Sequence, residues 1–193
     1  MAVFSFGQPE GGICQLAFTV PDIHAAMRAY GESLRAGPWF YMEGAEITNA
    51  RYRGRPMIFQ GNMACANVGH MMIELIEQKN PGPSVFTEVI ESRGYGLHHH
   101  AIAVRDFDAQ VAAYHARGYE IAFECVTGMS NRVAYFDTRG ELPFFIEVLE
   151  ATEMLERVFL GVYQQAATWD GRNPYRTFAS FDEIAAPASA LRT

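Results

Sequence analysis

The sequence has few cysteines, no excess of basic residues and no long apolar run, and each shortage excludes a class of protein. Its three cysteines stand far apart, which argues against a disulfide framework and a cysteine-based zinc site, and is typical of a reducing cytoplasm. Acidic residues outnumber basic ones by 22 to 15, so nucleic acid is not an expected partner. No apolar run approaches the roughly 20 residues of a membrane span, and residues 1–12 show no signal peptide. We therefore expect a cytoplasmic protein without a nucleic-acid or membrane partner.

The composition is that of a folded globular protein. Apolar residues make up 49% of the chain and charged residues 19%, which excludes intrinsic disorder. A chain of 193 residues buries roughly two thirds or more of its unfolded surface and needs no crosslinks. This length suits one domain, or two half-domains that share a core.

The sequence contains an internal repeat. Residues 15–23 match residues 99–107, because both are short runs of alternating apolar residues that end in Asp and a bulky apolar residue. Further along, residues 71–77 match residues 144–150, and the first copy is 11 residues longer between its two matching segments. Self-similarity of this kind indicates a duplicated structural unit. We assign the extra length to a longer loop within residues 44–66.

Each copy predicts a strand, a helix and about three further strands. Asp22 and Asp106 directly follow the first strands and are good N-caps for the helices. Gly37 and Gly118 lie where C-terminal caps belong. The further strands are predicted at residues 57–60 and 69–78 in the first copy, and at residues 120–125, 132–137 and 143–150 in the second.

These elements predict an α+β fold made of two βαβββ modules, residues 13–80 and 97–150. Residues 81–96 are expected to connect the modules through a helix. Residues 151–193 lie outside the repeat and are expected to form a C-terminal helix, over residues 152–167, and a loose tail. Each module has only one helix to cover its sheet, so the other face of the sheet is left to enclose something.

Four polar residues fall on that other face, because side chains alternate along a strand: Gln15, Glu74, His99 and Glu147. A carboxylate between apolar neighbours in a strand is costly unless it is paired or bound to a metal, and Glu74 and Glu147 show this feature at equivalent positions of the repeat. One imidazole, one amide and two carboxylates are a good ligand set for a divalent metal ion such as Zn, Ni, Co, Mn or Fe. The alternative is that the two carboxylates are edge-strand charges facing solvent.

Four motifs in this order resemble the vicinal oxygen chelate superfamily, which includes glyoxalase I, methylmalonyl-CoA epimerase, extradiol dioxygenases and bleomycin- or fosfomycin-resistance proteins. The motifs are residues 15–22, 73–77, 97–104 and 146–150, and the resemblance covers residues 13–150. It implies a pair of βαβββ modules that form a curved mixed sheet around one metal ion. It also implies that the ligands come from the first and last strands of each module, which are the strands of Gln15, Glu74, His99 and Glu147.

Within the superfamily, the ligand order Gln–Glu–His–Glu is similar to glyoxalase I of the zinc type, whereas residues 96–104 look more like methylmalonyl-CoA epimerase. Both relatives transfer a proton at a carbon next to a carbonyl. The resemblance therefore implies a metal-dependent isomerase, epimerase or lyase, with Glu147 as the base and Glu74 as its counterpart on the opposite face. A small carbonyl compound, as a CoA or glutathione conjugate, is the implied substrate, and a homodimer is the implied assembly. Glu43 or Glu46 is a further candidate base.

Two other functions stay open at this point. A ring-cleaving or other Fe(II) dioxygenase of the same superfamily would need redox-active iron and a His where Gln15 stands. A non-catalytic small-molecule-binding protein of the same superfamily would typically lack the acidic ligands. Several residues could be structural or could take part in the site: His70, His98, His100, Arg51, Arg53 and Arg55.

Overall fold

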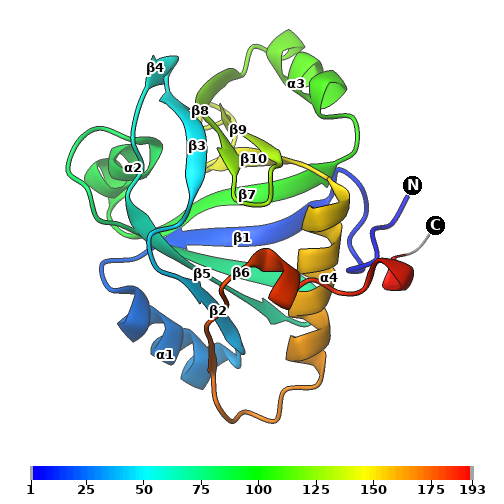
Figure 1. The fold of residues 1–193 in the computed structure, drawn as a ribbon. Coiled ribbons are helices and arrows are strands. Elements are labelled where there is room, and N and C mark those ends of the chain that lie inside the picture. Colours follow the sequence, from blue (N-terminus) through cyan, green and yellow to red (C-terminus); the bar gives the residue numbers. More distant parts are fainter. Residues whose placement is uncertain (1, 192–193) are drawn as a thin grey trace.

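A mixed sheet of eleven strands runs through the part of the chain that the computed structural model describes, residues 2–191 (Figure 1). Its strand order is β11-β2-β5-β6-β1-β7-β10-β9-β8-β3-β4. The strands are β1 (Ile13–Thr19), β2 (Trp39–Met42), β3 (Ile47–Tyr52), β4 (Arg55–Pro56), β5 (Gly61–Val68), β6 (Met71–Gln78), β7 (Gly96–Val104), β8 (Glu120–Thr127), β9 (Arg132–Asp137), β10 (Phe145–Glu150) and β11 (Tyr175–Arg176). The helices are α1 (Ile23–Leu34), α2 (Val85–Arg93), α3 (Phe107–Ala116) and α4 (Glu153–Ala167), with short 3-10 turns at Phe181–Glu183 and Ala188–Ala190.

The strand order confirms the repeat and the predicted α+β fold. In one half, β1 pairs in parallel with β6, which continues to β5 and β2. In the other half, β7 pairs in parallel with β10, which continues to β9 and β8. The two halves join where β1 and β7 run antiparallel at the centre of the sheet. Each half is therefore a βαβββ unit, and α2 connects them.

The longer first copy contains a hairpin that was expected to be a loop. Strands β3 and β4 pair with each other, and β3 also pairs with β8 at the edge of the second module. The strand predicted at residues 57–60 is wrong: those residues lie between strands, and β5 follows them at Gly61–Val68. Asn and Gly residues within β5 weaken its apolar pattern, and this is why the sequence did not predict it.

Three of the four predicted helix caps are confirmed. Asp22 accepts from the backbone N–H of Ala25 and Asp106 from that of Ala109, both at 2.9 Å. Gly118, which follows the C-cap residue of α3, has a φ of 84°, a conformation that suits glycine at a helix end. The prediction for Gly37 is wrong, because α1 already ends at Arg35, which adopts the left-handed conformation itself.

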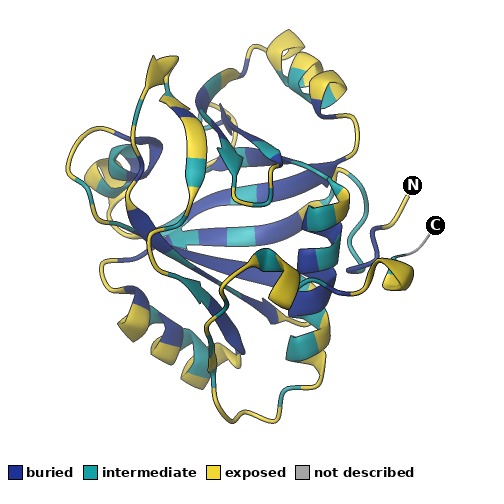
Figure 2. Cartoon of the chain, in the orientation of Figure 1, coloured by how far each residue is buried: buried dark blue, intermediate teal, exposed yellow. Residues whose placement is uncertain are grey.

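The two faces of the sheet pack against different elements. Helices α1 and α3 cover one face over apolar clusters that include Ile73 and Leu75 in one module and Ile102 and Val148 in the other. The outer surfaces of these two helices are exposed, whereas the strands beneath them are buried (Figure 2). The opposite face packs against α2, α4 and the C-terminal segment. None of the helices within residues 2–191 combines the length and apolar character of a membrane span.

The expectation of a loose C-terminal tail is wrong for residues 175–186. Strand β11 pairs with β2, and Phe178, Phe181 and Ile184 pack into the core on the inner face of the sheet. Gly161 of α4 permits this packing, because a Cβ at that position would overlap the carbonyl group of Ile184. Three widely spaced apolar residues in an Ala-, Ser- and Pro-rich segment gave too weak a periodic signal to predict it.

Candidate functional site

The four predicted residues lie on four adjacent central strands. Gln15 is on β1, Glu74 on β6, His99 on β7 and Glu147 on β10. Ala17 is the register partner of both Glu74 and His99. In the same way, Ala101 is the register partner of both Gln15 and Glu147. Register partners share one face of a sheet, so all four polar side chains project from the inner face.

His99 lies between the two carboxylates. Its Nε2 is 3.1 Å from Oε2 of Glu147 and 3.6 Å from Oε2 of Glu74. His99 is fully buried, and Glu147 and Glu74 expose only 5% and 9% of their surface. Burial lowers the pKa of His99 to about 3, so the imidazole is neutral and these contacts are not ion pairs.

The neighbouring His98 determines which nitrogen of His99 carries the proton. Nε2 of His98 lies 3.0 Å from the carbonyl oxygen of Val85, which can only accept, so this nitrogen donates. Burial lowers the pKa of His98 well below its usual value, so its Nδ1 is unprotonated. That Nδ1 is 2.9 Å from Nδ1 of His99, which must therefore donate. Nε2 of His99 is left with a lone pair directed at the carboxylates.

The site holds buried acceptor atoms without hydrogen-bond partners, which a cation could bind. Nε2 of His99 and Oε2 of Glu147 are buried and have no hydrogen-bond partner among the described residues. Both are acceptors, as is the nearby oxygen of Glu74, and such groups repel one another unless a cation or proton lies between them. Nitrogen and carboxylate ligands of this kind suit a divalent transition-metal ion.

The site is not fully preorganised for a metal ion. In the part of the chain that the structure describes, no group of three His, Cys, Asp or Glu side chains already has metal-binding geometry. The amide nitrogen of Gln15 is directed at Sδ of Met72, 3.7 Å away. The donor set therefore fits a divalent ion, with small side-chain shifts on binding, and the role of these four residues as ligands stays a prediction.

Each carboxylate has a side-chain neighbour on the adjacent outer strand. Cys65 on β5 is the register partner of Glu74, and its thiol donates to Oε1 of Glu74 at 3.9 Å. Tyr135 on β9 is the register partner of Glu147. Burial raises the pKa of Glu147, and a hydrogen bond with Tyr135 partly opposes this. Burial and then the charge of Glu147 raise the pKa of Glu74 well above its usual value.

Cys65, Tyr135 and His98 are therefore site residues that the sequence analysis missed or left open. The positions of Cys65 and Tyr135 follow from the pairing of β5 with β6 and of β9 with β10. A correct prediction of β5 would have found Cys65. The partner of His98, Val85, lies in a connecting segment for which the repeat offers no template.

A cavity of about 900 Å³ opens onto this face of the sheet. Gln15, Glu74 and Glu147 line it, while the fully buried His99 lies beneath its surface. Its walls come from β2, β5, β8, α4 and the C-terminal segment. Glu43 and Glu46, predicted as further candidate bases, also line the cavity.

Two of the other histidines lie outside this cavity. Nδ1 of His70 is 3.2 Å from the carbonyl oxygen of Phe6, and its ring stacks on Tyr163. The ring of His100 packs on Phe144, 3.8 Å between centroids. Neither residue lines the cavity as far as the described residues show. The contacts of both histidines are therefore those of structural residues.

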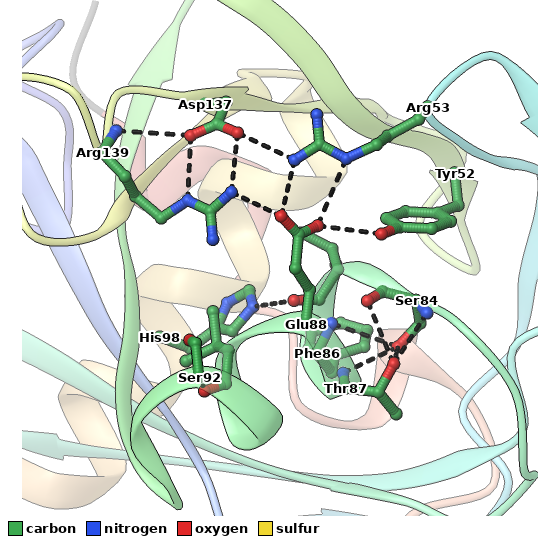
Figure 3. A network of polar contacts seen from close by, with 12 residues as sticks. Tyr52, Arg53, Ser84, Phe86, Thr87, Glu88, Ser92, His98, Asp137 and Arg139 are labelled. Atoms are coloured by element: carbon green, nitrogen blue, oxygen red, sulfur yellow. Dashed lines mark hydrogen bonds and ion pairs between the residues drawn. The ribbon is translucent and has the colours of Figure 1, made fainter.

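The three arginines of the β3–β4 hairpin also lie away from the cavity. Arg53 binds Glu88 at 2.7 Å and Asp137 at 2.8 Å, and Arg139 binds the same two carboxylates (Figure 3). This network joins the hairpin to α2 and to the end of β9. It satisfies the charge of Arg53 within the protein, although all three arginines are exposed to solvent.

Comparisons with known proteins agree with the fold. The Glyoxalase/Bleomycin resistance protein/Dioxygenase superfamily profile matches residues 14–136. A hypothetical protein from Bacillus halodurans C-125 superposes with a TM-score of 0.52 at 19% identity, covering 72% of this chain and 94% of that one. Methylmalonyl-CoA epimerase from Mycobacterium tuberculosis superposes with a TM-score of 0.52 at 16% identity, covering 75% of this chain and 91% of that one. No curated protein sequence matches the chain.

Proposed function

Because the chain belongs to the Glyoxalase/Bleomycin resistance protein/Dioxygenase superfamily, we propose that it is a metal-dependent isomerase, epimerase or lyase that transfers a proton at a carbon next to a carbonyl. The main support is the convergence of the neutral His99 and the buried carboxylates of Glu74 and Glu147 at one end of a large cavity. Gln15, Glu74, His99 and Glu147 would hold the ion.

A divalent cation supplies positive charge beside the substrate carbonyl oxygen, where negative charge develops as the neighbouring carbon loses its proton. Glu147 is the proposed base. Its Oε2 is buried without a hydrogen-bond partner among the described residues, and burial makes the carboxylate a stronger base. Tyr135, on the neighbouring strand, holds this carboxylate in place.

Glu74 is the proposed counterpart of Glu147. The two carboxylates approach His99 from strands on opposite sides of β7 and β1, so they face the reacting carbon from different directions. The thiol of Cys65 donates to Glu74 and restricts its orientation. The walls of the cavity shield both carboxylates from bulk water, which strengthens electrostatic interactions inside it.

The test is solvent-deuterium exchange into a panel of α-carbonyl compounds, including acyl-CoA esters and thiohemiacetals, with the metal-loaded protein. We expect exchange at the α-carbon, reduced about 100-fold or more in Glu147→Gln. Glu120→Gln, which changes an exposed carboxylate on β8, is the matched control and should exchange like the unmodified protein. Exchange that is unchanged in Glu147→Gln, or oxygen consumption by the iron-loaded protein without exchange, would contradict the proposal.

A further inference from the structure

The cavity at the candidate site has no cationic side chain in its lining. Among the described residues that line it, none is Lys, Arg or His, and five are acidic: Glu43, Glu46, Glu74, Glu147 and Asp182. Glu74 and Glu147 lie at the buried end, whereas Glu43, Glu46 and Asp182 are exposed to solvent. The solvent-exposed part of the lining, which we take as the entrance of the cavity, is therefore acidic.

The remainder of the lining is largely apolar and aromatic. It includes Phe40, Phe86, Phe123, Phe159, Phe178 and Phe181. These rings come from β2, α2, β8, α4 and the C-terminal segment, so they surround the space on several sides. Aromatic walls of this kind favour a flat or alkyl ligand body over a strongly hydrated one.

The basic residues on nearby elements already have partners within the protein. Arg53 and Arg139 bind Glu88 and Asp137. On α4, Nε of Arg157 donates to the carbonyl oxygen of Ala186. The chain has one lysine, Lys79, and it pairs with Glu77 at 2.6 Å. No described basic side chain is therefore directed into the cavity to receive a phosphate or carboxylate.

A CoA or glutathione conjugate does not suit this lining. The phosphates and carboxylates of such conjugates need Arg, Lys or backbone N–H donors, whereas this cavity presents carboxylates along its entrance. Like charges placed opposite one another suppress binding of the wrong ligand. Glu43, Glu46 and Asp182 would oppose an anionic tail wherever it leaves the cavity.

We propose that the ligand of this cavity carries no anionic group, and that it has an aromatic or alkyl body and two neighbouring oxygen atoms at the end that reaches Glu74, His99 and Glu147. The position of the two oxygens rests on the proposed function, because they would face the metal ion. The apolar body and the absence of an anionic group rest on the lining alone. Four of the six rings, those of Phe40, Phe86, Phe123 and Phe159, are buried and suit an apolar body. The exposed carboxylates of Glu43, Glu46 and Asp182 disfavour an anionic group.

The test is a binding titration with three matched probes: 1-phenyl-1,2-propanedione and its derivatives with a carboxylate or a trimethylammonium group at the para position. The para substituent lies at the end remote from the two oxygens. We expect the uncharged probe and the trimethylammonium probe each to bind at least tenfold more tightly than the carboxylate probe. Binding of the carboxylate probe that is as tight as that of the uncharged probe, or tighter, would overturn the proposal, and so would saturable binding of an acyl-CoA ester that displaces the uncharged probe.

A charge reversal at the entrance gives a second test. Asp182→Lys should tighten binding of the carboxylate probe about threefold to tenfold at low salt, lose this gain at high salt, and leave the uncharged probe unaffected. Glu120→Lys, on an exposed part of β8, is the control and should change neither affinity. No gain for the carboxylate probe in folded Asp182→Lys protein would contradict an acidic entrance.

Binding of the three probes is measured with metal-free protein and with Glu147→Gln. Neither is expected to catalyse deuterium exchange, so the ligand class is tested separately from the proposed function. Selective binding of the uncharged probe without deuterium exchange in the metal-loaded protein would support the ligand class and contradict the proposed function. Exchange into an acyl-CoA ester would support the proposed function and contradict the ligand class.

Discussion

At the scale of single residues, the orientation of the His99 lone pair is the feature on which the candidate site depends most. It follows from two hydrogen bonds, one from His98 to Val85 and one from His99 to His98. Groups that hold a metal-binding histidine in one tautomer raise metal affinity. His98 is therefore a positioning residue, although it does not itself face the carboxylates.

His98→Phe removes the acceptor for Nδ1 of His99, and we expect it to weaken metal binding about 10- to 100-fold. His98→Gln, whose amide oxygen can accept the same proton, should recover part of the loss. Competition with a chromogenic chelator measures these affinities. His100→Phe, a neighbouring histidine outside the cavity, is the control. Metal affinity in His98→Phe equal to that of the unmodified protein would contradict this role.

The sequence predicted the positions of Gln15, Glu74, His99 and Glu147 because strand alternation and the repeat both apply to them. It did not distinguish the role of His98 from that of His100. The role of His98 depends on its hydrogen bond with Val85, the first residue of α2, which the sequence did not predict. It also did not exclude the hairpin arginines as ligand-binding groups, because the partners of Arg53 are 35 and 84 residues away in the chain.

At the scale of elements, the hairpin β3–β4 is held by ion pairs as well as by its pairing with β8. Arg53 contacts two carboxylates, and 37% of its side chain is exposed. We expect Arg53→Ala to lower the free energy of unfolding by about 1 to 2 kcal/mol, because two charge-assisted hydrogen bonds are lost near the surface. Arg55→Ala, in the same hairpin, changes an arginine that has no ion pair among the described residues, and should have a much smaller effect. Urea denaturation measures both, and equal effects would contradict the role of Arg53.

The same network predicts how stability depends on acid. Hydrogen bonds from Arg139 and Arg53 hold the pKa of Asp137 well below its usual value, despite burial. Burial would raise the pKa of Glu88, but hydrogen bonds from Arg53 and Arg139 outweigh it and lower the pKa. Both groups therefore stabilise the fold at neutral pH, and this contribution is lost as the pH falls from about 4 towards the lowered pKa values of the folded state.

Arg139→Ala should reduce this acid sensitivity. We expect its free energy of unfolding to fall less steeply than that of the unmodified protein between about pH 4 and pH 2, because the two carboxylates lose a shared partner. Urea denaturation at a series of pH values gives the two slopes. Identical slopes would contradict the assignment of acid sensitivity to this network.

The packing of the C-terminal segment on α4 is a second prediction at this scale. Gly161→Ala places a Cβ against the carbonyl group of Ile184, so we expect residues 175–186 to detach and the protein to lose about 1 to 3 kcal/mol of stability. Gly140→Ala, which meets no atom within 4 Å, is the control. Hydrogen exchange should increase in residues 175–186 of Gly161→Ala only. Unchanged protection there would contradict the close packing.

At the scale of the whole molecule, two copies of one unit form a sheet whose central strands carry the candidate site. The order of strands in each copy was predictable, because the apolar patterns of β1, β6, β7 and β10 are strong. The hairpin that crosses from the first copy to β8, and the C-terminal segment that completes the cavity, were not predictable. Both depend on contacts between parts of the chain for which the repeat has no equivalent.

The most direct test of the account is the binding of a divalent ion to the purified protein. We predict that calorimetric titration of metal-free protein with Mn²⁺ or Co²⁺ gives one ion per chain. We also predict that Glu74→Gln and Glu147→Gln each weaken binding by at least tenfold, while Glu120→Gln does not. The absence of binding, or affinities that are the same in Glu74→Gln, Glu147→Gln and the unmodified protein, would contradict a metal site at these carboxylates.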